Sequence, residues 1–386
     1  MTLQLFTRLS SSYFFYFALL GLVTPFLSVF LDGKGFNSLE VGEILAIITA
    51  TKIIAPSLWA MLADKSGRQL AIIQLGALLA LLSFVLLYWL DAFWPITLSL
   101  ALFSLFWTAI LPQLEVLTLS SVRRSGKIYA RIRLWGSIGF IALAIITGEV
   151  MSIFTYQSFI TVGSLLLICL LISTLRLKQP VKTLTTHNSE TTIFIRLFKL
   201  PFIIFFISGI LLQISFGPFY SFFALYLRDL EYPDYAVGLL ISIGVVAEVI
   251  VFIFAGKIFT YFSVKWLLLL SLFITAIRWY FTGNYGDVLW LLILTQLLHA
   301  ASFAIYHSAS MQFLSEYFNR SEQGRGQAVY LGGVYGLGGA IGAYIAGHLW
   351  LDGAGATYAF NIAAFASLIG AMLLLFLPTS FQAKTL

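Results

Sequence analysis

An acidic side chain and a basic side chain occupy matching positions in two successive apolar segments. Glu115 lies within the first segment and Arg133 within the second, and a short basic turn containing Arg123, Arg124 and Lys127 separates them. If the turn closes an antiparallel helix pair, Glu115 and Arg133 are equally far from it, so a constant helical rise places them at one depth. A carboxylate and a guanidinium at one depth can bind a polar group of a substrate, or each other until a substrate arrives. The alternative is a purely structural pair that fastens the two helices.

The composition indicates the environment of these charges. Hydrophobic residues make up 60% of the 386 residues, whereas charged residues make up only 10%. A soluble domain of this size needs more polar surface, so the composition indicates a multi-pass membrane protein. The hydrophobic segments are about 20 residues long, as an α-helix across a bilayer requires, and they lack the alternation of a membrane β-barrel. The single cysteine, Cys169, excludes a disulfide framework within the chain.

Twelve segments have the length and hydrophobicity of membrane-spanning helices. We place them at residues 10–31, 41–62, 70–90, 95–119, 131–154, 157–175, 200–226, 236–257, 266–283, 288–315, 327–350 and 355–377. Lys and Arg concentrate in alternate loops, which predicts that both termini lie in the cytoplasm. The longest polar segment, residues 177–199, predicts a cytoplasmic linker between a six-helix bundle at residues 1–176 and another at residues 200–386.

The two halves of the chain repeat each other at an offset of 196 residues. Gly42 opens the second span, and Gly238 opens the eighth. The turn after the second span, residues 60–69, corresponds by the same offset to residues 256–265. This regularity predicts two structurally similar bundles.

The turn after the second span resembles the loop signature of the major facilitator superfamily. It reads AMLADKSGRQ, and its Asp64, Gly67 and Arg68 match the signature G-x-L-a-D-r-x-G-r-r, whereas its first and last positions depart from it. Gly67 allows a tight reversal, and Asp64 can accept hydrogen bonds from the helix end and from arginines opposite. The resemblance implies a gating loop; the alternative is a plain cytoplasmic hairpin.

Further segments resemble a narrower group within that superfamily. YARIRLWGS at residues 129–137 is similar to the start of the fifth helix in lactose permease and in phenylpropionate permeases, and its WGS is nearer the latter. GVVAEVI at residues 244–250, RW at residues 278–279 and LLH at residues 297–299 also resemble the phenylpropionate-permease type. The resemblance covers essentially the whole chain. It implies an all-α fold of twelve membrane helices in two pseudo-symmetric bundles, and proton symport of an aromatic carboxylate.

Two opposite charges occupy equivalent positions in the repeat. Lys52 lies midway along the second span, and the offset of 196 residues leads to Glu248 in the eighth. A lone ion at mid-membrane costs roughly 2.5–3.5 kcal/mol, so we expect neither side chain to face lipid. They could pair across the interface between the bundles, or Lys52 could bind a substrate carboxylate while Glu248 takes the coupled proton. Lys52 could instead extend its amine to a lipid headgroup.

The resemblance to lactose permease also implies roles for four charges. Glu115 and Arg133 correspond to its substrate-binding pair. Arg278 and His299 lie close to the arginine and histidine of its coupling cluster. The lysine and glutamate that flank that histidine in lactose permease are replaced here by Gln296 and Ser302. The lactose mechanism therefore does not transfer as a whole, and a galactoside substrate is not expected.

The tenth span carries a stripe of polar and aromatic side chains at helical spacing. The stripe comprises Gln296, His299, Phe303, Tyr306 and Ser310, with His307 beside it. On a helix that lines a cavity, such a stripe offers hydrogen-bond donors among aromatic walls, and histidine titrates near neutral pH. Either histidine could instead serve only as a donor between helices. Zinc ligation is not expected, because two turns separate the histidines and no third ligand is evident.

Prolines predict bends in two spans that are dense in aromatic residues. Pro25 lies in the first span and Pro218 in the seventh. Proline frees backbone carbonyls and bends a helix, so we expect the aromatic side chains near these positions to form cavity walls.

Together with these patterns, the resemblance implies a proton-coupled transporter that takes up a small organic substrate by alternating access. The candidate substrate-binding or proton-coupling residues are Lys52, Glu115, Arg133, Glu248, Arg278, His299, Tyr306 and His307. The favoured substrate is an aromatic carboxylate such as 3-phenylpropionate. The alternative is a sugar or nucleoside whose hydroxyls bind Glu115 and Arg133.

The sequence lacks the features that two other classes of function, receptors and enzymes, require. A receptor needs a signalling domain, and neither the linker nor the tail after Pro378 is long enough for one. An enzyme needs a nucleophile–base pair or a metal cluster, and neither is evident. The sequence contains no phosphate-binding loop, so ATP is not expected to be the energy source. We expect a monomer in a bacterial inner (plasma) membrane, with the lipid bilayer, protons and a small substrate as its partners, and neither a cofactor nor nucleic acid.

Overall fold

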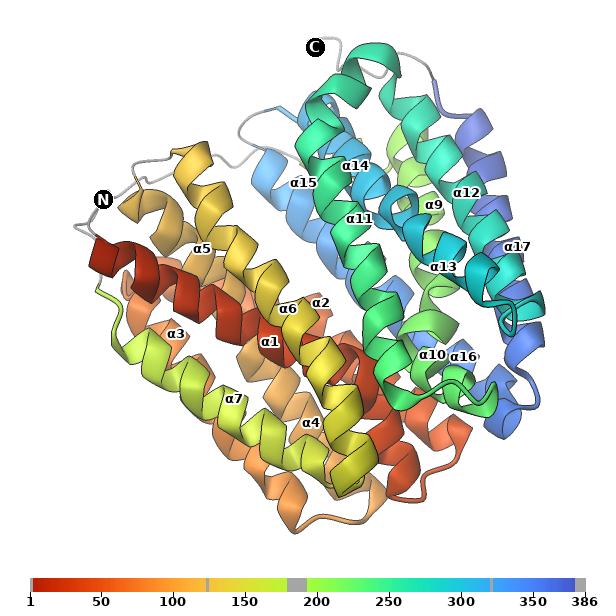
Figure 1. The fold of residues 1–386 in the computed structure, drawn as a ribbon. Coiled ribbons are helices and arrows are strands. Elements are labelled where there is room, and N and C mark those ends of the chain that lie inside the picture. The colour runs from red at the N-terminus through yellow and green to blue at the C-terminus, as the bar shows by residue number, and fades with distance from the viewer. Residues whose placement is uncertain (1–2, 123–124, 179–192, 320–321, 379–386) are drawn as a thin grey trace. The chain divides into compact units, whose positions relative to one another are not determined.

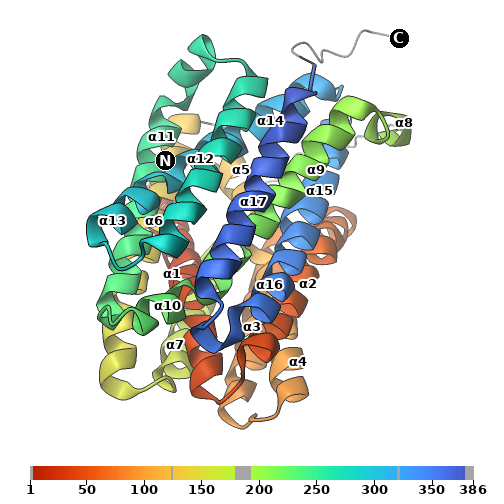
Figure 2. The ribbon, with the colours of Figure 1, turned by 90° about the vertical axis from the view of Figure 1, so that its right-hand side faces the viewer.

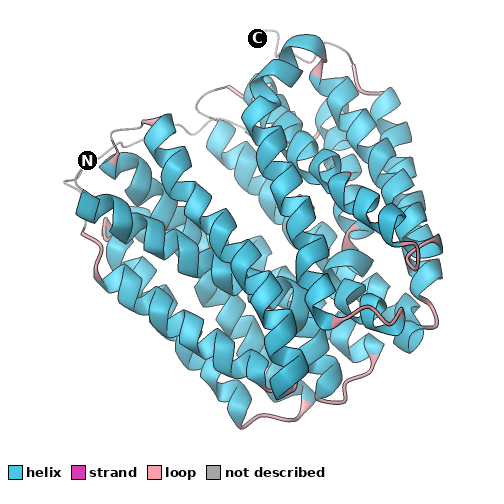
Figure 3. Ribbon diagram, in the orientation of Figure 1, coloured by secondary structure: helices cyan, strands magenta, loops and turns pink. Residues whose placement is uncertain are grey.

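A computed structural model describes residues 3–122, 125–178, 193–319 and 322–378, and these residues form helices and no strand (Figure 3). Twelve helical segments among them are long and apolar enough to cross a membrane. They are Leu3–Gly33, Ser38–Ala63, Gln69–Tyr88, Phe93–Ser121, Gly126–Phe154, Ser158–Leu175, Leu200–Asp229, Asp234–Phe254, Val264–Asn284, Leu289–Tyr317, Gln323–Gly353 and Ala356–Leu375. Each overlaps one predicted span. The predicted fold class, an all-α multi-pass membrane protein with twelve spans, is confirmed.

The chain divides into two compact units, which are described separately. The first combines the described residues of Met1–Thr183 with Phe223–Ser242, and the second combines those of Leu184–Phe222 with Ile243–Leu386. The predicted bundle boundaries at residues 176 and 200 stay a prediction, because most of the predicted linker at residues 177–199 lies outside the described residues.

Seven helices make up most of the first unit. They are α1 (Leu3–Gly33), α2 (Ser38–Ser66), α3 (Gln69–Val85), α4 (Phe93–Trp107), α5 (Ile110–Ser121), α6 (Gly126–Phe154) and α7 (Ser158–Leu175). The helices α4 and α5 form one span, which is interrupted at Thr108 and Ala109. Along its length, α1 packs against α6 (Figure 1).

The second unit contains most of the remaining helices, and α10 and α11 cross the boundary between the units. These helices are α8 (Ile193–Leu197), α9 (Leu200–Ser215), α10 (Gly217–Asp229), α11 (Asp234–Tyr261), α12 (Val264–Asn284), α13 (Leu289–Leu297), α14 (Tyr306–Tyr317), α15 (Gln323–Tyr330), α16 (Gly339–Trp350) and α17 (Ala356–Leu375). Within the unit, α17 lies between α12 and α9 (Figure 2).

Three spans of the second half depart from regular α-helix. The seventh span breaks at Phe216, just before Pro218. The tenth contains a π-helical segment at Ala301–Ile305, and the eleventh contains another at Leu331–Gly338. Such π-helical segments widen the turn and often occur at functional sites. By contrast, α1 continues through Pro25, so the predicted bend there does not interrupt the helix.

The second helix ends as the loop motif predicts. Gly67 adopts a left-handed conformation (φ 61°), and its N–H donates to the carbonyl of Ala63 at 2.8 Å. A side chain disfavours this conformation, which explains a glycine at the reversal. Arg68 is exposed at the start of α3, and the side chain of Asp64 lies outside the described residues. The gating role of this loop stays a prediction.

Glycines bring α1 and α6 into close contact. A Cβ atom on Gly21 would clash with the carbonyl of Phe140, and one on Gly139 would clash with the carbonyl of Phe14. In the second unit, a Cβ on Gly342 of α16 would come within 2.8 Å of the carbonyl of Ile214 in α9. Small residues allow membrane helices to approach this closely. The first span thus packs against the fifth in the same manner as the seventh packs against the eleventh, and the repeat relates these two pairs.

Substitution of Gly139 with alanine tests this close packing. Alanine normally stabilises a helix relative to glycine, but at Gly139 its Cβ would push α6 away from the backbone of α1. We expect Gly139→Ala to destabilise the protein by about 1–3 kcal/mol, measured as a lower thermal-unfolding midpoint in detergent. Gly126→Ala on the same helix is the control, because a Cβ there meets nothing within 4 Å. Equal midpoints for both variants would contradict the packing argument.

Candidate substrate and proton site

Three ionisable side chains of the second unit form a continuous hydrogen-bonded chain. A guanidinium nitrogen (NH1) of Arg278 on α12 lies 2.7 Å from Nδ1 of His299. The other ring nitrogen of His299, Nε2, lies 2.6 Å from a carboxylate oxygen of Glu248 on α11. The side chain of Arg278 is completely buried, and Glu248 retains 14% exposure. The structure therefore brings together three predicted site residues from three spans.

The hydrogen-bond network assigns the tautomer of His299. A guanidinium can only donate, so Nδ1 of the imidazole must accept the bond from Arg278. Nε2 then carries the proton and donates it to Glu248. The arrangement is a cation and an anion joined by a neutral ring. A second proton on Nδ1 would face the N–H of Arg278 and break that bond.

Aromatic rings surround the buried guanidinium. The central carbon of the Arg278 guanidinium lies 4.5 Å from the ring centre of Phe219 and 4.2 Å from that of Trp279. The Trp279 indole donates to Ser215 at 3.0 Å, which fixes its orientation. Nε and NH2 of Arg278 have no hydrogen-bond partner within the described part of the chain. Buried donors without partners are costly, and two on one guanidinium can bind a carboxylate in a bidentate manner.

A series of stacked rings continues from His299 along the tenth span. The centre of the His299 ring lies 5.9 Å from that of Phe303, which lies 6.0 Å from that of His307, and the three planes are nearly parallel. Nδ1 of His307 lies 3.1 Å from the hydroxyl of Tyr335 in the other π-helical segment. The sequence pattern places His307 beside the stripe. In the structure it stacks in line, because the π-helical segment changes the rotation per residue.

The remaining polar residues of the predicted stripe are buried. Tyr306 retains 1% exposure, Ser310 retains none, and Gln296 retains 1%. The hydroxyl of Ser310 lies close to the hydroxyls of Tyr306 and of the neighbouring Tyr330. Each hydroxyl of such a buried group can donate one hydrogen bond and accept others, so the group can also bind a water molecule or a polar ligand group.

In the first unit, Glu115 and Arg133 do not form an ion pair within 4 Å, as far as the described residues show. The hydroxyl of Tyr129 on α6 donates to a carboxylate oxygen of Glu115 at 3.3 Å. The Arg133 guanidinium instead lies over the ring of Phe17, with its central carbon 3.8 Å from the ring centre. The structure thus leaves the Arg133 cation without a carboxylate partner among the residues it describes.

Aromatic residues lie around this second arginine, and sequence reasoning missed Trp107 and Tyr129 among them. Trp107 stacks on Phe103 at 5.4 Å and lies 5.1 Å from the ring of Tyr16. The Trp107 indole N–H has no hydrogen-bond partner within the described chain. The hydroxyl of the fully buried Tyr13 lies close to those of Thr118 and Tyr129. The density of aromatic residues in the first span points to Tyr13 and Tyr16. No sequence pattern singles out Trp107, or Tyr129 as the partner of Glu115.

Lys52 differs from the other candidates because its side chain is exposed. It lies on α2 beside Ile53 and Ile54, which are also exposed, while Ala55 and Trp59 form the buried face. We find no hydrogen bond or ion pair from Lys52 to any residue that the structure describes. Lys52 and Glu248 belong to different compact units, so their pairing stays a prediction. Within the described ranges, no group of three His, Cys, Asp or Glu residues could hold a metal ion.

The comparisons with known proteins agree with this architecture. The MFS_1 like family matches residues 6–362. This chain belongs to that family of major facilitator transporters. It is 30% identical over 355 residues to a probable 3-phenylpropionic acid transporter of Escherichia coli K12, covering 91% of this chain and 92% of that one.

Two further relatives extend the comparison. Maltose permease of Geobacillus stearothermophilus is 25% identical over 374 residues, covering 95% of this chain and 92% of the permease. The crystal structure of a mutant of the nucleoside transporter NupG superimposes with a TM-score of 0.87 at 18% identity, covering 97% of this chain and 99% of that one. That likeness shows the fold. These relatives are transporters, not enzymes.

A double-mutant cycle tests the charge balance between Arg278 and Glu248. Arg278→Gln leaves the Glu248 carboxylate without its cation, and Glu248→Gln leaves the buried Arg278 without its anion. We expect each single substitution to destabilise the protein by about 3–5 kcal/mol. The double variant should lose at least about 1 kcal/mol less than the sum, because both charges are then absent. Thermal or denaturant unfolding in detergent measures the three effects; simple additivity would show that His299 does not couple the charges.

Proposed function

We propose that this major facilitator protein takes up a small organic acid together with protons by alternating access, and that an aromatic carboxylate such as 3-phenylpropionate is its substrate. The observation that carries the proposal is the buried Arg278, which has two unused donors, aromatic neighbours and a hydrogen-bonded link to Glu248. The name of the Escherichia coli relative supports the substrate class.

The geometry suggests how an aromatic acid would bind. Its carboxylate would accept hydrogen bonds from Nε and NH2 of Arg278, the two donors that no described protein group uses. Its ring would pack against Phe219 and Trp279, which already border the guanidinium. The side chains of Phe219 and Trp279 must make room, since Arg278 has no exposed surface in this state.

Proton coupling would follow from charge balance. The site holds one cation, Arg278, and one anion, Glu248, so a substrate carboxylate adds a second anion. Uptake of a proton on Glu248 or His299 would restore the balance in a region of low dielectric constant. Release of the substrate would then favour release of the proton.

The other candidate residues have supporting roles in this proposal. Lys52 or Arg133 would provide a further contact for the substrate anion, and Glu115 is an alternative proton carrier. Tyr306 and His307 would contribute polar contacts farther along the tenth span. We place the transporter as a monomer in a bacterial inner membrane with both termini in the cytoplasm.

Substitution of Glu248 with glutamine tests the proton assignment. Glutamine keeps an acceptor for His299 but cannot carry a proton. In proteoliposomes, we expect Glu248→Gln to abolish accumulation of 3-phenylpropionate driven by a pH gradient, a loss of at least about tenfold, while exchange across the membrane continues. Glu149→Gln, at an exposed acid on α6, is the control. Accumulation that survives in Glu248→Gln would assign the proton to another group.

A sugar or nucleoside is the second candidate substrate, and the first unit favours it. The unpaired Arg133 donates, Glu115 accepts, and Phe17 provides an aromatic face, which is a combination that suits hydroxyl groups. The relative named maltose permease fits this alternative. Exchange of labelled 3-phenylpropionate against unlabelled aromatic acids, maltose and nucleosides discriminates the two: competition by aromatic acids alone supports the first candidate, and competition by maltose or nucleosides alone supports the second.

A further inference from the structure

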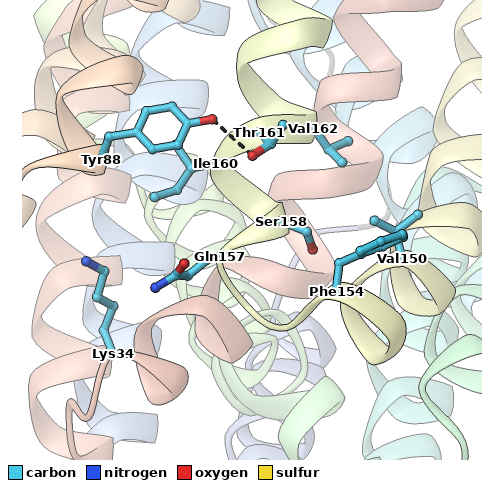
Figure 4. Close-up of a pocket in the computed structure, with 9 residues that line it drawn as sticks. All are labelled: Lys34, Tyr88, Val150, Phe154, Gln157, Ser158, Ile160, Thr161 and Val162. Atoms are coloured by element: carbon cyan, nitrogen blue, oxygen red, sulfur yellow. Dashed lines mark hydrogen bonds between the residues drawn. The ribbon is translucent and has the colours of Figure 1, made fainter.

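The first unit contains a hollow that the transport mechanism does not use. It has a volume of about 430 Å³, and its lining includes Lys34, Tyr88, Val150, Phe154 and Gln157 (Figure 4). Four of these residues lie where spans begin or end. Lys34 follows the span Leu3–Gly33, Tyr88 and Phe154 end their spans, and Gln157 directly precedes the span Ser158–Leu175. The hollow is therefore at the depth where helices leave the hydrocarbon, which is the depth of lipid headgroups.

The hollow has a cation that is largely shielded from solvent. The Lys34 side chain is only 10% exposed, and its amine donates to the carbonyl of Leu90 at 3.0 Å. It also pairs with the carboxylate of Asp91, whose side chain is 86% exposed. An ammonium has three N–H donors, so one remains for a ligand. An exposed carboxylate forms a weak pair that another anion can displace.

An amide and an apolar wall complete the site. The Gln157 amide makes no hydrogen bond within the described chain and points toward Lys34 (Figure 4). Val150 and Phe154 of α6 and Ile160 of α7 provide the apolar part of the lining. A shielded cation and a free amide suit a phosphate oxygen, while the apolar wall suits a hydrocarbon chain.

We propose that this hollow binds a membrane glycerophospholipid. Its phosphodiester accepts hydrogen bonds from Lys34 and Gln157, and one acyl chain packs against Val150 and Phe154. When the lipid is absent, Asp91 pairs with Lys34, so the incoming phosphate competes with Asp91 for this amine. A free phosphate ion would leave the apolar wall unused, so the lipid is the occupant that matches the whole lining.

Two substitutions with opposite expected effects test the proposal. Native mass spectrometry of the full-length, delipidated protein would measure binding of dimyristoyl phosphatidylglycerol. We expect Lys34→Met to weaken binding about tenfold, since it removes a charged hydrogen-bond donor. We expect Asp91→Asn to strengthen binding several-fold, because the competing carboxylate is gone. Lys127→Met, which removes an exposed lysine outside the hollow, should leave binding unchanged and controls for general attraction of anionic lipid.

Other outcomes would overturn the proposal. If Asp91→Asn weakens binding as much as Lys34→Met does, the Lys34–Asp91 pair is structural and the phosphate does not compete with it. If inorganic phosphate or deacylated glycerophosphoglycerol displaces the lipid at equal concentration, the site takes a free anion and the apolar wall has no role. If neither substitution changes lipid binding, the hollow is not a lipid site. Asp91→Asn alters an exposed side chain and keeps the test decisive even if Lys34→Met fails to fold.

Discussion

The second unit depends on how one fully buried guanidinium is neutralised. An arginine without exposure in the middle of a span is tolerable only with a counter-charge and with hydrogen bonds. Glu248 supplies the negative charge, and the neutral ring of His299 joins it to Arg278 by a hydrogen bond on each side. Because the ring is bonded on both sides, its position and tautomer depend on both neighbours. Helices α11 and α12 and the tenth span are therefore held together by a polar link that responds to the addition or loss of one proton.

The close helix contacts allow such a link to keep its geometry. In the second unit, the glycines of the eleventh span let it approach α9 at backbone distance, and Trp279 is held by Ser215 at the end of α9. The π-helical segment at Ala301–Ile305 begins two residues after His299 and sets the direction of the stacked rings that follow. Rigid packing beside an irregular helical turn holds a few polar groups in place while some of their donors and acceptors stay unbonded. A binding site requires such positioned, unbonded groups.

Features that depend on local sequence could be predicted, and features that depend on tertiary geometry could not. Twelve spans follow from segment length and hydrophobicity, and the reversal at Gly67 follows from the backbone freedom of glycine. The sequence shows that the charge of Arg278 within a span is energetically costly. Its bond to His299 depends on how two helices are rotated about their axes, which hydropathy does not encode. For the same reason, equal depth did not make Glu115 and Arg133 a pair: depth follows from helical rise, whereas contact also needs the right rotation about each axis. The π-helical segments leave no signature in the sequence pattern.

The two units contain the same kinds of side chain but connect them differently. Each has an arginine against aromatic rings and an acid that a neutral ring donor holds: Tyr129 holds Glu115, and His299 holds Glu248. In the second unit the ring donor also bonds the arginine, so acid and base are coupled. In the first unit Tyr129 donates to the acid but not to the arginine, and Arg133 lies over Phe17 without a bond to Glu115. The imidazole of His299 offers one nitrogen to the acid and the other to the arginine, whereas the Tyr129 hydroxyl has no bond to Arg133 within the described chain. The coupled arrangement therefore suits proton transfer, whereas the uncoupled one suits recognition of a neutral or anionic substrate group.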